Sequence, residues 1–133
     1  MKALKSKVTM GLQKGSFVPT CDNSGAKLIK IIAVIGGKTR AGRNPSCGVS
    51  SLVMASVVDG NQEMRKQVVY AIIVRQRKEY RRPDGMRIGF EDNAAVVLKD
   101  EKGNPKGTIL KGAIAKEVAD RWPAVSKLAN LIL

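Results

Sequence analysis

Short apolar runs separated by turn-forming residues cover most of the first hundred positions of the chain. Most are rich in β-branched residues and are bounded by glycine, asparagine, aspartate or serine, which is typical of strands joined by turns. Four strands are predicted over Leu28–Ile35, Ser51–Val58, Val68–Val74 and Ala94–Leu98, and two weaker ones over Ser16–Cys21 and Gly107–Leu110. Turns at intervals of about ten residues favour a small closed β-barrel.

The apolar period changes near the C-terminus. Apolar residues recur there at spacings of four, three and four, which is typical of one helix face; they are Val118, Trp122, Val125 and Ala129. Pro123 interrupts this stripe, and proline is tolerated in the first turn of a helix but not in its interior. We therefore predict two short helices, about Ala115–Asp120 and Pro123–Leu128, whose apolar stripe packs on the barrel.

The length and composition fit one globular domain. The chain has 133 residues, of which 44% are hydrophobic and 26% are charged, which argues against a disordered chain. A single domain spanning residues 1–133 is expected, with the β-barrel over about 1–112 and the helical segment over about 113–133.

Charge changes this picture, because 24 basic residues stand against 11 acidic ones and the net charge is +13. Such a basic balance is typical of nucleic-acid-binding proteins. The excess is uneven: residues 1–50 hold nine basic side chains and one acidic, whereas residues 91–133 hold seven and six. The last third is therefore expected to pack on the fold or to contact a different partner.

Several functional classes are excluded or disfavoured by composition. The chain has no histidine, which removes Ser/His/Asp triads, Cys/His dyads and histidine metal sites. Cys21 and Cys47 are too few for a zinc site of four cysteines and are expected to be reduced core residues; a bridge between them would need an oxidising compartment. No apolar run reaches the roughly 18–20 residues of a membrane span, and no convincing secretory signal is present, so a soluble intracellular protein is expected.

Two basic clusters directly follow predicted strands. The first contains Lys38, Arg40 and Arg43, and the second contains Arg75, Arg77, Lys78, Arg81 and Arg82. Arginine forks match the geometry of phosphate oxygens, and Tyr80 within the second cluster offers a ring on which an exposed base could stack. The alternative is that both clusters are merely solvated loops. Two clusters on a chain of this net charge favour nucleic-acid binding.

Turn chemistry accompanies these clusters. Pro83-Asp84-Gly85 closes the second cluster, and here proline presets φ while glycine accepts a positive φ. A similar turn signal, with Asn23 and Gly25, precedes the first clear strand.

Signals for catalysis are weak. Residues 36–39 have the Gly-Lys-Thr end of a phosphate-binding loop but lack the glycine that this pattern needs five positions earlier. Glu91 and Asp92 are an adjacent pair in a turn-rich stretch, which suits a solvated or backbone-capping role better than a metal or catalytic one. We therefore predict no catalytic residues, no metal and no cofactor.

A longer pattern links these features. Residues 71–74 (AIIV), Asp84-Gly85, Phe90, Asn93 and residues 96–97 (VV) follow one another at fixed spacings over 27 positions (71 to 97). This pattern resembles the signature of the universal large-subunit ribosomal protein of the L-fourteen family. Blocks at residues 22–27, 105–108 and 111–117 also resemble that family, although Ala113 stands where it usually has proline. The blocks at residues 64–67, 74–78 and 121–123 look like its archaeal and eukaryotic branch.

The resemblance implies a mainly β fold: a five-stranded β-barrel with a protruding β-ribbon and two short C-terminal α-helices. It implies a structural, non-enzymatic protein of the cytoplasmic ribosome that binds large-subunit rRNA and contacts neighbouring ribosomal proteins. It further implies small-subunit rRNA at an inter-subunit bridge and an anti-association initiation factor as partners. The basic clusters would then contact rRNA, and the protein-partner surface would include Thr108, Lys116, Asp120 and Lys127.

Two other classes of function were compared with this one. A freestanding single-strand binder would stack bases on clustered aromatics, but the five aromatic residues are scattered along the chain at Phe17, Tyr70, Tyr80, Phe90 and Trp122. An enzyme is disfavoured because no nucleophile and base are paired in the sequence. Salt-resistant co-sedimentation with large subunits would separate a ribosomal protein from a freestanding binder.

Overall fold

A computed structural model describes residues 2–36 and 44–133, so Lys38, Arg40 and Arg43 of the first basic cluster lie outside the described residues. The longer strands are β3 (Ala26–Val34), β5 (Leu52–Gly60), β6 (Val68–Arg75) and β9 (Ala94–Leu98). The short strands are β1 (Leu12–Gln13), β2 (Phe17–Pro19), β4 (Ser46–Cys47), β7 (Tyr80–Arg81), β8 (Arg87–Ile88), β10 (Ala113–Ile114) and β11 (Leu131–Ile132). The helices are α1 (Lys116–Arg121) and α2 (Pro123–Ser126).

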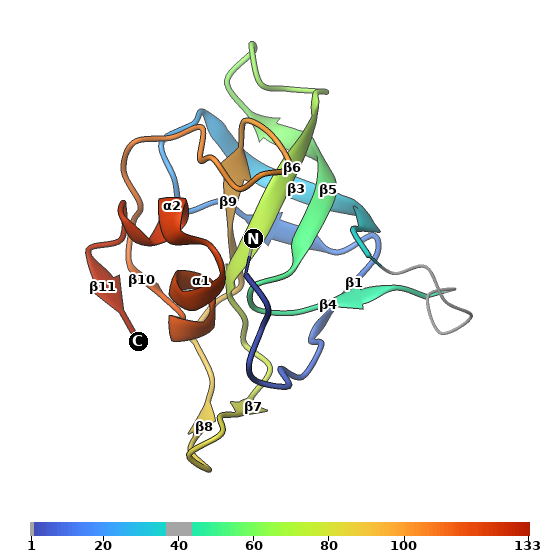
Figure 1. Ribbon diagram of the computed structural model, residues 1–133. Helices are drawn as coiled ribbons and strands as arrows, with labels where there is room; N and C mark the ends of the chain where they lie inside the picture. The colour runs from blue at the N-terminus through green and yellow to red at the C-terminus, as the bar shows by residue number, and fades with distance from the viewer. Residues whose placement is uncertain (1, 37–43) are drawn as a thin grey trace.

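The central element is a five-stranded antiparallel sheet with the order β2-β3-β5-β6-β9. The sheet curls until its two edges meet, because Thr20 forms a bridge with Ala95 and the Cys21 N–H donates to the Ala95 carbonyl at 3.1 Å. Figure 1 shows the strands wrapped around one another, with the helices on one side. The predicted mainly β fold with a five-stranded barrel is confirmed.

Strands β6 and β9 separate two hydrophobic cores. Along β9, Ala95 and Val97 belong to the core that includes Ile29 of β3, whereas Val96 packs in a second core with Trp122. All five residues of β9 are therefore buried. A strand covered on both faces needs apolar residues at consecutive positions, which explains the unbroken apolar runs at residues 71–74 and 94–98.

The C-terminal helices cover the second core, as the apolar stripe predicts. Val118, Trp122 and Val125 are buried, and Pro123 begins α2 directly after Trp122. The Trp122 indole N–H donates to the Ser50 carbonyl at 3.0 Å. A Cβ on Gly103 would lie 2.5 Å from the Trp122 ring, so only glycine fits beneath it. Helix α2 ends two residues before the predicted Leu128, and the prediction is otherwise confirmed.

The strand predicted over Gly107–Leu110 is wrong. Leu110 forms only an isolated bridge with Asp22, and the segment is held by the Asn23 side chain, whose Oδ1 accepts from the Thr108 N–H at 2.8 Å. A side-chain amide thus replaces a strand partner here.

The described residues also form three pairs of two-residue strands, β1–β4, β7–β8 and β10–β11, whose positions the apolar pattern did not predict. The β7–β8 hairpin projects from the barrel at the bottom of Figure 1 and forms the protruding ribbon. Two residues are too few to show the alternation by which strands are recognised in sequence.

Both cysteines are buried free thiols, one in each core. Burial raises the pKa of Cys21 to about 11 and that of Cys47 to about 12. These thiols stay protonated and unreactive at neutral pH. No helix within residues 2–36 and 44–133 is long and apolar enough to cross a membrane.

Candidate nucleic-acid interface

The second basic cluster divides into side chains that turn into the fold and side chains that face solvent. Arg75 turns inward, and its side chain is only 12% exposed. Its Nε lies 2.9 Å from Asp92 Oδ1, and its Nη1 donates to the carbonyls of Lys111 (3.0 Å) and Ala113 (2.8 Å). Gly112 permits this approach, since a Cβ there would lie 2.7 Å from Nη1. Arg75 therefore joins the end of β6 to the start of β10.

Arg82 also turns inward, onto a buried carboxylate. Its Nε lies 2.9 Å from Glu117 Oε1, and the two side chains are 14% and 7% exposed. The Tyr80 hydroxyl donates to Glu117 Oε2 at 2.8 Å, and Arg82 Nη2 also donates to the Leu133 backbone oxygen. The pKa of Tyr80 is raised to about 12, mainly by burial and to a lesser extent by the contact with Glu117. The phenol therefore remains a neutral hydrogen-bond donor. This network fastens the hairpin to α1 and to the end of β11.

Gln76, between Arg75 and Arg77, is buried, and its side-chain amide hydrogen-bonds to three backbone groups. Its Nε2 donates to the carbonyls of Thr9 (2.8 Å) and Lys78 (2.9 Å), and its Oε1 accepts from the Val49 N–H at 3.0 Å. The amide thus holds the N-terminal segment beside the end of β6. This contact places residues 5–7, which are far away in sequence, near the hairpin.

We call Arg75 and Arg82 the inner set, and Arg77, Lys78 and Arg81 the outer set. All three members of the outer set are exposed. Among the residues that the structure describes, no carboxylate lies within ion-pair distance of an outer-set side chain.

Arg81 meets the N-terminal segment at an open groove, which we call the basic groove. Its lining residues are Lys5, Ser6, Lys7, Arg81, Arg82 and Pro83. No acidic side chain of the described chain lines the groove, and the charge of Arg82 is already balanced by Glu117. Lys5, Lys7 and Arg81 therefore give it a positive potential, which attracts phosphate.

The turn of the hairpin, residues 82–85, borders the basic groove. The Gly85 N–H donates to the Arg82 carbonyl at 2.9 Å, and the Met86 N–H donates to Asp84 Oδ1 at 3.0 Å. Gly85 has φ +91°, in the region where a β-carbon is costly. Pro83 is the second residue of this turn and lies on the groove itself.

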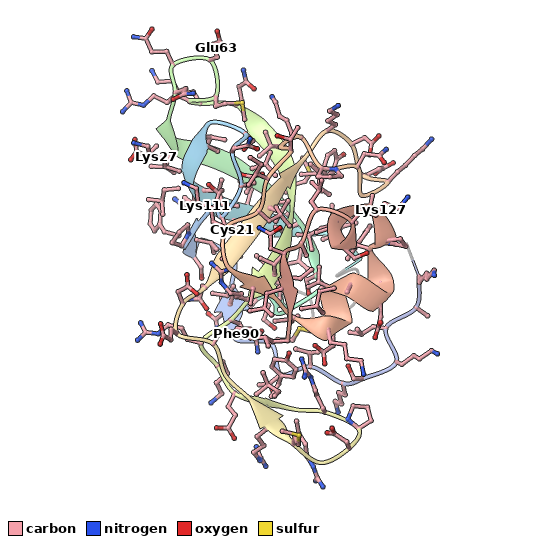
Figure 2. The ribbon with its side chains drawn as sticks, turned by 90° about the vertical axis from the view of Figure 1, so that its left-hand side faces the viewer. Cys21, Lys27, Glu63, Phe90, Lys111 and Lys127 are labelled. Carbon is pink, nitrogen blue, oxygen red and sulfur yellow. The ribbon has the colours of Figure 1, made fainter. Side chains whose placement is uncertain are left out.

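The residues predicted for a protein-partner surface lie on helix α1, at the C-cap of α2 and on the loop before β10. Lys116, Asp120 and Lys127 are exposed, and Figure 2 shows Lys127 on the helical side of the molecule. Lys116 and Asp120 line a cavity of about 280 Å³ between α1, the hairpin and the N-terminal segment. This cavity adjoins the basic groove, with which it shares Lys5, Ser6, Arg82 and Pro83. Thr108 is exposed on a separate loop, where its hydroxyl accepts from the Asn23 amide at 3.0 Å.

The second predicted turn lies beside that loop. Gly25 has φ +101°, and its carbonyl accepts from the Asn61 N–H at 2.9 Å. Asn23 and Gly25 therefore connect this turn to loops that are distant in sequence, Asn23 to the loop at Thr108 and Gly25 to the loop at Asn61.

Sequence reasoning did not identify Gln76, Asp92 or Glu117 as partners of the basic cluster. Glu117 had a usable signal, because it directly precedes Val118 on the buried side of a predicted helix, and an acid in that position needs a partner. Asp92 is expected from the sequence to be solvated or to cap backbone; its side chain is 53% exposed, and it also pairs with Arg75. Within the described ranges, no group of three or more Cys, Asp or Glu side chains could hold a metal ion.

Comparison with known proteins agrees with this architecture. The profile of the family described as "Ribosomal protein L14p/L23e" matches residues 11–133. The chain is 49% identical over 133 residues to the large ribosomal subunit protein uL14 of Nanoarchaeum equitans, covering all of both chains. It is 49% identical over the full length to uL14 of Haloarcula marismortui, and 50% identical to that of Methanococcus vannielii over 99% of each chain.

The family profile covers most of the chain, and the identity to archaeal relatives extends from end to end. The barrel, the projecting hairpin and the C-terminal helices are those that the sequence resemblance implies. The chain therefore belongs to the L14p/L23e family of ribosomal proteins, and it is a structural, non-enzymatic protein of the large ribosomal subunit.

Proposed function

We propose that the chain binds large-subunit rRNA in the cytoplasmic ribosome through the basic groove and the adjoining outer set. The observation that supports this most strongly is the lining of the groove: it contains lysines and arginines from two distant segments and no acid within the described chain. Basic side chains that converge without acidic partners are suited to bind the phosphates of RNA. Each phosphate that they neutralise releases counterions, which favours binding.

The inner set and Tyr80 are left out of this interface. The guanidinium groups of Arg75 and Arg82 already donate hydrogen bonds to Asp92, Glu117 and backbone oxygens. Tyr80 has no exposed surface, so its ring has no face for a base. The proposed contacts of the described second cluster are therefore Arg77, Lys78 and Arg81.

Co-sedimentation tests this assignment. We expect the parent chain, expressed in an archaeal host, to sediment with large subunits in a sucrose gradient at high salt. Changing Arg77, Lys78 and Arg81 together to Ala should release most of the protein from the subunits. The control changes Lys99, Lys102 and Lys111 to Ala, which removes the same charge from exposed positions elsewhere and should leave sedimentation unchanged. Equal retention of the two triple variants would remove the outer set from the interface.

A second proposal concerns the helical side, where Lys116, Asp120 and Lys127 lie, together with the separate loop that carries Thr108; these four residues remain the predicted contacts. An exposed surface of mixed charge is a better match for a protein than for a polyanion, and it lies in the third of the chain with nearly balanced charge. The resemblance to the family adds an anti-association factor and small-subunit rRNA at a bridge as its partners.

Charge reversal tests the helical side. We expect Lys116→Glu with Lys127→Glu to weaken factor binding in a pull-down with assembled subunits, while incorporation into the subunit stays normal. Both residues are exposed, so the fold should tolerate the change. Undiminished factor binding would place that surface elsewhere.

A further inference from the structure

A second exposed surface lies on β2 and β3, away from the basic groove. Phe17 of β2 is 55% exposed. The other four aromatic residues of the chain, all within the described ranges, are buried or partly buried. Lys30 of β3 is the strand partner of Phe17, and its ammonium nitrogen lies 5.8 Å from the centre of the Phe17 ring. An exposed ring beside a cation is thus built into the sheet.

The neighbouring positions extend this surface across the sheet. Lys30 is paired with Ser56 of β5, and Ser56 is paired with Val68 of β6, which is 55% exposed. Pairs across adjacent strands project on the same side of a sheet. The row therefore presents an aromatic ring, an ammonium group, a hydroxyl group and an apolar side chain together.

The exposed charges of the segment that carries Phe17 are of one sign, and the exposed Asp59 on the neighbouring strand β5 is ion-paired with Arg65 at 3.6 Å. Between Leu12 and Gly36 the exposed charged side chains are Lys14, Lys27 and Lys30. The lone acid of this segment, Asp22, is 7% exposed and accepts hydrogen bonds from the Val97 N–H and the Ser24 hydroxyl. Figure 2 shows Lys27 on the side of the molecule opposite to Lys127 and well above the hairpin.

From this combination we infer that the β2–β3 surface is a stacking site for one unpaired nucleotide of RNA. The base stacks on Phe17, and Lys30 pairs with the phosphate, while Lys27 of β3 and Lys14 of the turn between β1 and β2 add positive charge to this surface. Stacking on an aromatic ring requires an unpaired base, because paired bases in a duplex already stack on their neighbours. The positive charge of Lys14, Lys27 and Lys30 favours RNA over an apolar protein partner, since Asp59 of β5 is already ion-paired with Arg65.

This inference rests on the proposed RNA binding and adds to it a separate site with a different chemistry. The basic groove would hold phosphates of either paired or unpaired RNA. The Phe17 site discriminates between them, since it needs the face of a free base.

The test uses full-length protein and two probes, a single-stranded adenylate decanucleotide and a duplex of equal length. Phe17→Trp keeps a stacking ring and adds fluorescence at the site, and the parent supplies the background signal of Trp122, which is buried. Phe17→Leu keeps an apolar side chain but removes the ring. Phe17 is largely exposed, so both variants should melt with the parent.

We expect the single strand, but not the duplex, to quench the emission of the Phe17→Trp variant. Phe17→Leu should bind the single strand about tenfold more weakly than the parent, and Lys30→Gln should weaken it less. Duplex binding should be equal in all four proteins.

Equal binding of the single strand by parent and Phe17→Leu, without quenching in Phe17→Trp, would overturn the stacking site while leaving the proposed groove intact. A Phe17→Leu variant that binds both probes normally but fails to enter subunits would also overturn it, because the surface would then be covered by protein. Failure of the parent to bind either probe or large-subunit rRNA would overturn the groove and the stacking site together.

Discussion

Two sets of basic side chains from one eight-residue stretch have opposite surroundings. The inner set, Arg75 and Arg82, is 12% and 14% exposed and ion-paired, whereas the outer set, Arg77, Lys78 and Arg81, is exposed. The acids that pair with the inner set, Asp92 and Glu117, come from later parts of the chain. A count of basic residues in a cluster therefore overstates the surface that is available to RNA.

The comparison also separates side chains that contribute to the stability of the fold from side chains that contribute to RNA binding. A buried ion pair depends on its partner, because an uncompensated charge in the interior is costly. An exposed arginine has little effect on folding, since water solvates it in either state. Changes to the inner set should thus alter stability, and changes to the outer set should alter RNA binding.

The largest expected effect is that of Glu117→Gln. This change keeps the shape of the side chain but leaves Arg82 without its counter-charge, and it should lower the free energy of unfolding by about 3–5 kcal/mol. Urea denaturation would measure it. The triple alanine variant of the outer set should stay within roughly 0.5 kcal/mol of the parent.

A compensating variant sharpens this result. Arg82→Met and Glu117→Leu, combined with Tyr80→Phe to remove the hydroxyl that donates to Glu117, remove both charges without leaving that buried donor unpaired and should recover much of the stability lost in Glu117→Gln. If Glu117→Gln unfolds at the same urea concentration as the parent, the buried pair does not stabilise the hairpin against α1.

A smaller effect is expected from Gly85→Val, which changes the turn without altering any charge. Gly85 has φ +91°, and a β-branched residue is strained there, so the cost should be about 1–3 kcal/mol. Thermal melting would measure it. Gly85→Ala should be milder, and a Val variant that melts with the parent would show that the turn relaxes without strain.

Much of the fold follows from local pattern. The runs at residues 68–74 and 94–98 gave strands β6 and β9 almost to the residue, and the stripe through Val118, Trp122 and Val125 gave the helices. The short strand pairs did not follow, since their partners are set by tertiary contacts. The segment 107–110 resembles a strand but is organised by the Asn23 side chain from 85 residues away.

The division of the basic cluster could not be predicted from strand alternation. Gln76 and Tyr80 are buried, while Arg77, Lys78 and Arg81 are all exposed, so the stretch does not follow a period of two. Its geometry is fixed by contacts of Gln76 with Thr9 and Val49, and of Arg82 with Glu117. These partners are distant in sequence, and only the folded chain brings them together.

The salt dependence of rRNA binding tests the division most directly. Each phosphate contact made by a basic side chain contributes roughly 0.7–0.9 to the slope of log K against log salt concentration. Replacing Arg77, Lys78 and Arg81 with Ala should therefore reduce the slope by about 2–3, with the unfolding free energy unchanged. A slope equal to that of the parent in a normally folded triple variant would contradict the account, because the outer set would then contact no phosphate.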